Sequence, residues 1–106
     1  MKIVYNRIIP FGKQFLAINL FGVLFAQGPC DRVTVNHEMI HTAQIKELWY
    51  LPFYIVYLLE WLWRLIIHRN YIKAYHAISF EREAYANQRD MNYLNNRKRF
   101  AFLKHL

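Results

Sequence analysis

An apolar stretch in the middle of the chain, residues 53–67, limits the folds that this sequence can adopt. It is apolar on nearly every helical face, and Pro52 precedes it at a position where a helix could begin. A helix of this kind must pack inside the protein, lie against a membrane or a hydrophobic partner, or cross a bilayer.

Charged residues in this stretch argue against a simple crossing. The longest uncharged run, residues 48–59, is twelve residues long and includes Pro52, whereas a spanning helix needs roughly 18–20 residues. Glu60 and Arg64 then follow at i and i+4, the favourable order for an ion pair, and a spanning helix would bury both near its middle. We favour a core helix, place an interfacial helix or hydrophobic partner surface second, and a simple span last.

The size of the chain and its single cysteine narrow the classes of site. The 106 residues suffice for one small domain, so we treat residues 1–106 as a single domain. Cys30 alone can form neither an intramolecular disulfide nor a thiolate zinc cluster, and it is most simply an inert thiol. Any metal must therefore be held by histidine and carboxylate.

The charge balance points to anionic partners. Fourteen Lys and Arg against seven Asp and Glu give a formal net charge of +7. The basic residues are spread along the chain, only residues 97–99 are contiguous, and no nucleic-acid-binding signature accompanies them. We therefore expect no nucleic-acid partner, and a protein that is cytoplasmic or peripheral to the membrane.

The first thirty residues favour short strands. Residues 2–9 alternate imperfectly between apolar and polar side chains, and residues 15–26 are rich in aromatic and branched side chains. Residues 10–12 predict a turn, and Gly28 with Pro29 closes the segment. We predict two or three strands in a small sheet or hairpin, with a helix or a signal-peptide core over residues 15–26 as alternatives.

Helical patterning begins after this segment. Asp31 or Thr34 can cap a first helix that runs to about Tyr50, and a second helix follows Pro52. A third helical region begins between residues 71 and 80 and reaches about Leu94, with a shorter helical or irregular tail. The predicted fold class is α+β, with a small N-terminal β-hairpin or sheet followed by three to four α-helices.

A metal-binding motif lies in the first predicted helix. His37, Glu38 and His41 form the pattern H-E-x-x-H. Positions i and i+4 share one helix face, so both imidazoles can reach one zinc ion at about 2.0–2.1 Å. Glu38 projects from the adjacent flank, where it could hold a water that zinc activates and take its proton. In isolation the motif also occurs by coincidence in proteins that bind no metal.

A zinc hydrolase needs a third protein ligand and an open fourth position. A third histidine near the motif is excluded, because Gln44 and Glu47 stand where an extended motif would continue. Carboxylates return about forty residues later, in the helical segment 80–87, which contains Glu81 and Glu83. One of these two carboxylates is the remaining candidate.

These two motifs resemble the gluzincin metallopeptidases, whose third ligand is a Glu on a later helix. Residues 81–87, E-x-E-A-Y-A-N, are similar to the E-x-x-A-D or E-x-x-A-N helix of the heat-shock and prenyl-protein membrane proteases, the antirepressor peptidases and the β-lactam sensor peptidases. The resemblance covers residues 36–50 and 79–90. It implies a minimal zincin-like domain that binds zinc through His37, His41 and a later Glu.

The resemblance also implies that Glu38 is the general base. The sequence departs from these families at Tyr85, where they often carry Asp. Glu81 precedes Tyr85 by four residues, as the family's ligand precedes its Asp or Asn, so the resemblance favours Glu81 as the third ligand.

Helix geometry supports the same choice between the two carboxylates. Two residues on a helix are separated by about 200° of rotation, so Glu81 and Glu83 point to nearly opposite faces. Glu81 shares its face with Ala84 and Tyr85, whereas Glu83 lies on a more polar face. We predict that Glu81 is the ligand and that Glu83 is solvated or supports the site from outside.

Three further side chains have two interpretations each. Tyr85 could donate a hydrogen bond to an oxyanion, although an aromatic side chain at helical spacing is more often part of a core. Gln44 and Glu47 could hold a ligand imidazole in one tautomer, although a solvated helix face is the more common explanation.

The leading hypothesis from the sequence is a zinc-dependent peptidase that hydrolyses a peptide or protein substrate, with Glu38 and Tyr85 as catalytic residues. An edge strand of the N-terminal sheet could receive an extended peptide. The alternative is a non-catalytic protein that the metal stabilises or that binds a membrane surface or a hydrophobic partner. A basic structural domain without metal is the third hypothesis.

Overall fold

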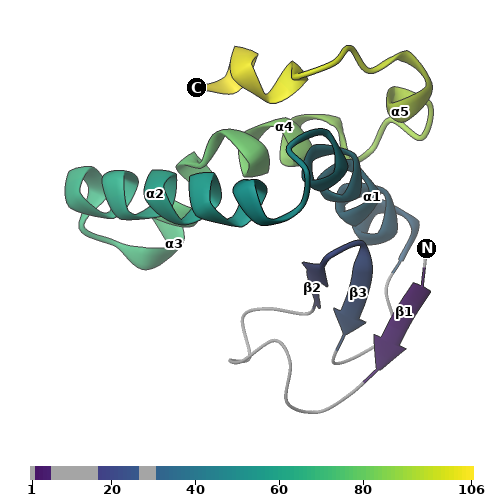
Figure 1. Ribbon diagram of the computed structural model, residues 1–106, viewed down its shortest axis with the longest axis horizontal. Coiled ribbons are helices and arrows are strands. Elements are labelled where there is room, and N and C mark those ends of the chain that lie inside the picture. Colours follow the sequence, from purple (N-terminus) through teal and green to yellow (C-terminus); the bar gives the residue numbers. More distant parts are fainter. Residues whose placement is uncertain (1, 6–16, 27–30) are drawn as a thin grey trace.

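The computed structural model describes residues 2–5, 17–26 and 31–106. A three-stranded sheet precedes the helices, and its strand order is β1-β3-β2. Strand β1 (Lys2–Tyr5) runs parallel to β3 (Val23–Ala26), and β2 (Ala17–Leu20) runs antiparallel to β3. The predicted α+β fold is confirmed (Figure 1). The predicted turn at residues 10–12, the closing residues 28–29 and Cys30 lie outside the described residues.

Strands β2 and β3 form a hairpin with a two-residue turn. Phe21 and Gly22 both have positive φ, 54° and 90°, as the tightest hairpin turns require. The backbone N–H of Phe21 donates to the Tyr54 hydroxyl at 2.7 Å, and that of Gly22 donates to the Asn19 side chain at 2.9 Å. The first bond holds the hairpin against the second helix, and the second bond closes the turn within the hairpin.

Five α-helices and one 3-10 helix follow the sheet. Their bounds are α1 Arg32–Glu47, α2 Leu51–His68, α3 Tyr71–Ala77, α4 Ser79–Asn87, α5 Tyr93–Asn96 and η1 Ala101–His105. Asp31 caps α1 by accepting the backbone N–H of Thr34 at 2.7 Å, which is one of the two caps predicted. Helix α1 ends before Tyr50, because Trp49 and Tyr50 have positive φ.

The third predicted helical region is divided into separate helices. Ile78 takes an extended conformation between α3 and α4, and α4 starts anew at Ser79. The Glu60 carboxylate accepts both the backbone N–H and the hydroxyl of Ser79. A carboxylate from α2 thus caps α4, and this tertiary contact explains why one continuous helix does not form.

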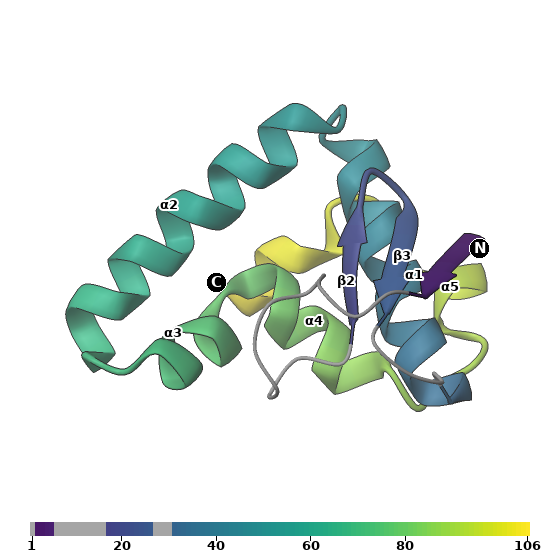
Figure 2. The same ribbon diagram turned by 90° about the horizontal axis from the view of Figure 1, so that it is seen from below.

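The core lies where α1, α2, α4 and η1 meet. Its buried cluster consists of Ile45, Phe53, Ile78, Phe80 and Phe102. Helix α4 packs against both α1 and η1, while the pair α2 and α3 extends away from the sheet (Figure 2). The core therefore fixes α1 and α4 side by side.

Helix α2 is not the core helix that the sequence favoured. Phe53 is its only buried residue, and its outward side chains have no cover among the described residues. By length and composition alone it could cross a membrane. The predicted ion pair is also absent from the described residues, because Glu60 turns toward Ser79 and does not meet Arg64.

Candidate metal centre

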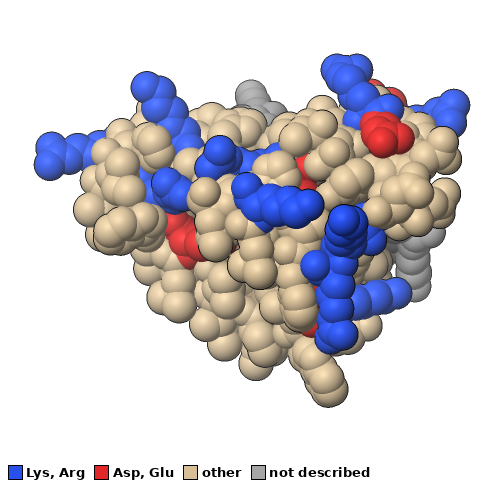
Figure 3. Space-filling view, turned by 90° about the horizontal axis from the view of Figure 1, so that it is seen from above, with Lys and Arg blue, Asp and Glu red and all other residues tan. Residues whose placement is uncertain are grey.

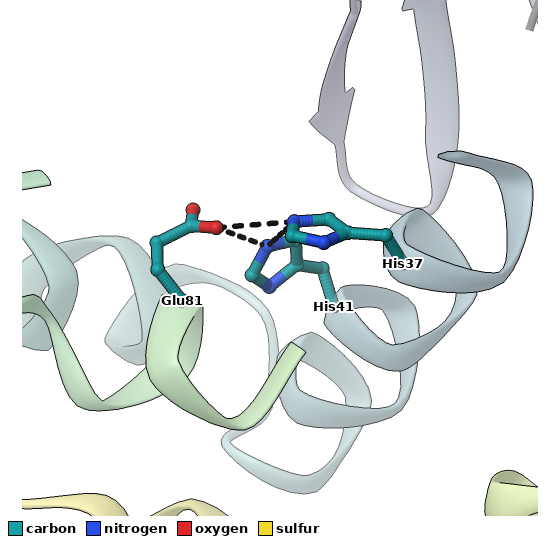
Figure 4. Close-up of side chains that lie close together, drawn as sticks. All are labelled: His37, His41 and Glu81. Atoms are coloured by element: carbon teal, nitrogen blue, oxygen red, sulfur yellow. Dashed lines mark hydrogen bonds and ion pairs between the residues drawn. The ribbon is translucent and has the colours of Figure 1, made fainter. Parts of the chain in front are cut away.

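Helices α1 and α4 bring the three predicted ligands together. His37 and His41 lie one turn apart on α1, and their Nε2 atoms are 3.1 Å from each other. Glu81 on α4 places its Oε1 atom 3.1 Å from His37 Nε2 and 2.9 Å from His41 Nε2 (Figure 4). All three residues are at most 5% exposed. The three atoms form a nearly equilateral triangle.

Two glutamine side chains orient the imidazoles from outside. His41 Nδ1 lies 2.7 Å from Gln44 Oε1, and His37 Nδ1 lies 2.9 Å from Gln88 Oε1. The orientation of the Gln44 amide is fixed, because its Nε2 donates to the Phe80 carbonyl and to the Glu83 carboxylate. An amide oxygen can only accept, so Nδ1 of each ring donates a proton, and in the neutral form of either ring Nε2 is bare toward Glu81.

This arrangement requires a positive charge at the centre of the triangle. With both rings neutral, two bare imidazole nitrogens and a carboxylate oxygen would face one another, and lone pairs at about 3 Å repel unless a proton or a cation lies between them. Around a tetrahedral zinc with bonds of 2.0–2.1 Å, ligand atoms are separated by about 3.3 Å. The observed distances of 2.9–3.1 Å therefore fit a shared metal ion after a small expansion.

The pKa shifts of Glu81 and His41 also indicate that a positive charge is favoured between these side chains. Burial opposes ionisation of Glu81, but the charge of His41 and the hydrogen bonds from both histidines hold its pKa well below the usual value. Burial lowers the pKa of His41, but the Glu81 carboxylate outweighs burial and raises this pKa to about 9. In the absence of a metal the cluster thus attracts a proton, which supplies the charge that a divalent ion would supply.

A tyrosine from α2 completes the surroundings of Glu81. The Tyr57 hydroxyl donates to Glu81 Oε2 at 2.6 Å, while Oε1 faces the two histidines. Both carboxylate oxygens therefore have partners, and the rotamer of Glu81 is fixed. Sequence reasoning missed Tyr57, since it lies in the apolar stretch and nothing in its spacing relates it to Glu81.

Glu38, the predicted general base, lies beside the ligands. It is 8% exposed, and burial raises the pKa of its carboxyl group, although the nearby His41 and His37 act in the opposite direction. Its backbone carbonyl accepts hydrogen bonds from Asn19 at 2.8 Å and from Thr42 at 3.1 Å. Asn19 belongs to β2, so the hairpin is attached to α1 at the motif itself.

Tyr85 lies at the outer margin of the site. Its ring packs edge-on against His37 with 4.5 Å between centroids, and its hydroxyl lies 3.2 Å from the Tyr75 hydroxyl. The residue is 40% exposed, so the alternative of an ordinary core aromatic is wrong. Its predicted role as an oxyanion donor stays a prediction.

Comparison with known proteins found no matching protein-family model, curated protein or solved structure. The case for a metal centre therefore rests on the geometry of His37, His41 and Glu81, together with their supporting residues.

Of the two positions predicted for Glu83, the structure excludes the solvated one and has the one that supports the site from outside. Glu83 is fully buried, and it accepts hydrogen bonds from Gln44, Tyr93 and Arg97, the last at 2.6 Å. Arg97 also forms a two-fold contact with Glu47, at 2.9 and 3.0 Å. Glu83 thus supports the site through Gln44, which in turn holds His41.

The solvated face expected for Gln44 and Glu47 is also wrong. Gln44 is fully buried and contacts a ligand imidazole, as the other interpretation had it, whereas Glu47 pairs with Arg97. The sequence offered one overlooked signal, because Gln88 follows Glu81 by seven residues and so lies two turns further on the same face. No comparable spacing indicated Arg97.

Replacing Gln88 with Ala should lower the affinity for zinc by about 10–100-fold, because His37 Nδ1 would lose the acceptor that fixes its tautomer. A zinc competition titration measures this change. Arg89→Ala, at the exposed neighbouring position, is the matched control and should bind zinc as the parent does. Equal affinity in both variants would show that Gln88 does not orient a ligand.

Proposed function

We propose that this chain is a zinc-dependent metallopeptidase. The observation that carries the proposal is the convergence of two imidazole nitrogens and one carboxylate oxygen on a single point, with the Glu38 carboxyl group beside them. Two histidines and a carboxylate suit zinc by ligand type. Three protein ligands leave a fourth position open, which is the arrangement of a catalytic site.

Glu38 provides the acid–base function in this proposal. A zinc ion bound in the triangle would supply a lowered water pKa and a polarised substrate carbonyl. Glu38 accepts the proton of the attacking water and returns it to the leaving amine. Tyr85, exposed beside His37, donates its hydroxyl to the developing oxyanion.

The position of the β2–β3 hairpin favours a peptide or protein as the substrate. Because β3 is the central strand, β2 has one edge without a strand neighbour among the described residues. The Asn19 side chain attaches β2 to the Glu38 carbonyl and to Thr42, so β2 lies against the motif helix. An extended peptide that adds to β2 as a further strand would pass next to Glu38.

One observation favours a second candidate function. The three ligands and Glu38 are at least nine-tenths buried, as in metal sites that serve only to stabilise a small domain. In that case the protein is a non-catalytic, metal-stabilised partner protein. Turnover, not metal content, separates the two functions.

The test combines metal analysis with a broad peptide library. We expect about one zinc per chain in the purified protein, and little in His37→Ala, because that variant lacks one of three ligands. We also expect the zinc-loaded protein to cleave library peptides, to lose this activity on chelation and to regain it with zinc. A zinc-loaded protein that is inert across the library would favour the second function. A parent protein whose zinc content equals that of His37→Ala would contradict both.

A further inference from the structure

The outward face of α2 is apolar along its whole length. Its exposed large hydrophobic residues are Leu51, Ile55, Val56, Leu58, Leu59, Leu62, Trp63, Ile66 and Ile67. The two charged residues of the helix, Glu60 and Arg64, are both turned partly inward. In Figure 3 the lower left margin, where α2 lies, is correspondingly without Lys or Arg. Soluble monomers rarely expose a continuous apolar face of this kind unless it binds something.

The opposite face of α2 packs against the rest of the protein. Phe53 is buried in the core, Tyr57 donates to Glu81, and Glu60 caps α4. These contacts extend over two turns of the helix, so the domain lies along its side. A bilayer crossing by α2 would carry the buried carboxylates of α4 to the depth of the hydrocarbon, which is costly. The geometry therefore suits a helix that lies in the plane of an interface.

A basic groove adjoins the apolar face at its C-terminal end. The groove lies between α2, α3 and α4, and its charged or ionisable lining consists of Arg64, His68, Lys73, His76 and Arg82. Among the described residues, no acidic side chain lines this groove. Arg64 Nε is buried and has no hydrogen-bond partner in the part of the chain that the structure describes. Buried donors are normally paired, so this group lacks an acceptor that a ligand could bring.

We propose that α2 lies in the interface of an anionic membrane, with its apolar face among the acyl chains and a lipid headgroup phosphate in the basic groove. Phosphate oxygens are acceptors that match the guanidinium of Arg64 and the ammonium of Lys73. Trp63 on the same face suits the boundary between headgroups and acyl chains.

Charge favours a membrane over a second copy of this chain. The formal net charge is +7, so two copies meeting through α2 would bring together two strongly basic molecules. An anionic bilayer offers the opposite charge at the groove and an apolar medium at the helix face. Each basic side chain near such a surface contributes about 1 kcal/mol, which corresponds to roughly a fivefold change in binding.

Vesicle flotation with the full chain tests the proposal. We compare vesicles of phosphatidylcholine alone with vesicles that also contain phosphatidylglycerol, and we expect at least tenfold stronger binding to the latter. The double variant Leu59→Glu/Ile66→Glu should lose binding to both, because it places charge in the apolar face. These positions are 60% and 71% exposed, so the fold should tolerate them.

A matched pair of charge variants tests the groove. Lys73→Glu/Arg82→Glu should remove the preference for anionic vesicles, whereas Lys98→Glu/Lys104→Glu, with the same change in charge at exposed positions outside the groove, should retain most of it. If both variants lost the preference for anionic vesicles equally, net charge alone would explain that preference. This result would contradict a headgroup site in the groove.

Two other results would overturn the proposal of an interfacial helix. A parent protein that ignores both kinds of vesicle, and instead forms dimers that Leu59→Glu/Ile66→Glu disrupts, would assign the face to a second copy. Retention in membranes after both high-salt and alkaline washing would assign α2 to a spanning helix.

Discussion

Replacing Glu38 with Gln is expected to leave zinc bound while reducing peptide hydrolysis by about 10²–10⁴-fold, the usual contribution of a positioned general base. The amide is isosteric with the carboxyl group but cannot accept the proton of the attacking water. The hydrogen bonds from Asn19 and Thr42 go to the backbone carbonyl of residue 38, so they remain in the variant. The measurements are kcat/KM for a cleaved library peptide and zinc content per chain.

The control for this variant is Asp90→Asn, which makes the same chemical change at an exposed loop position. It should retain both the zinc and the activity of the parent. If Glu38→Gln also lost its zinc, the loss of activity would report on the metal site and not on proton transfer. If it kept full activity, Glu38 would not be the base and the proposed mechanism would be wrong.

A second large effect should separate Glu81 from Glu83. Glu81→Gln should weaken zinc binding by more than the roughly 10–100-fold expected of a residue outside the ligand set, because a charged ligand oxygen is lost. Glu83→Gln should keep more of the zinc affinity, since it acts only through Gln44. Zinc competition titrations on the folded proteins give both affinities.

Glu83→Gln should also lower the stability of the protein without metal. Glu83 and Arg97 form a buried ion pair, and removing one charge of such a pair costs about 3–5 kcal/mol in the free energy of unfolding. Arg97 keeps its contact with Glu47, so we expect Glu83→Gln to lower the free energy of unfolding by about 3 kcal/mol, the lower end of this range. Urea unfolding of the chelated proteins measures this loss of stability.

A larger loss of zinc affinity in Glu83→Gln than in Glu81→Gln would contradict the assignment of Glu81 as the third ligand, while the assignment of the two histidines would stand.

Local patterns in the sequence predicted much of this protein. The strands, the cap at Asp31 and the first two helices depend on neighbouring residues, so alternation, capping chemistry and proline position indicated them. The three residues of the candidate site were predicted from rotation about a helix axis together with the resemblance to the gluzincin motifs. Positions i and i+4 place His37 and His41 together, and the 200° between Glu81 and Glu83 allows only one of them to face the histidines.

Contacts between distant residues decided what the sequence could not indicate. Tyr57 reaches Glu81 across 24 positions and Arg97 reaches Glu47 across 50, so no local spacing relates them. The burial of Glu83 and Gln44 follows from the packing of α4 on α1, and the division between α3 and α4 follows from Glu60. The exposure of α2 could not be predicted from the sequence either, because hydropathy measures only how apolar a helix is. Whether other parts of the chain cover such a helix is a property of the tertiary structure.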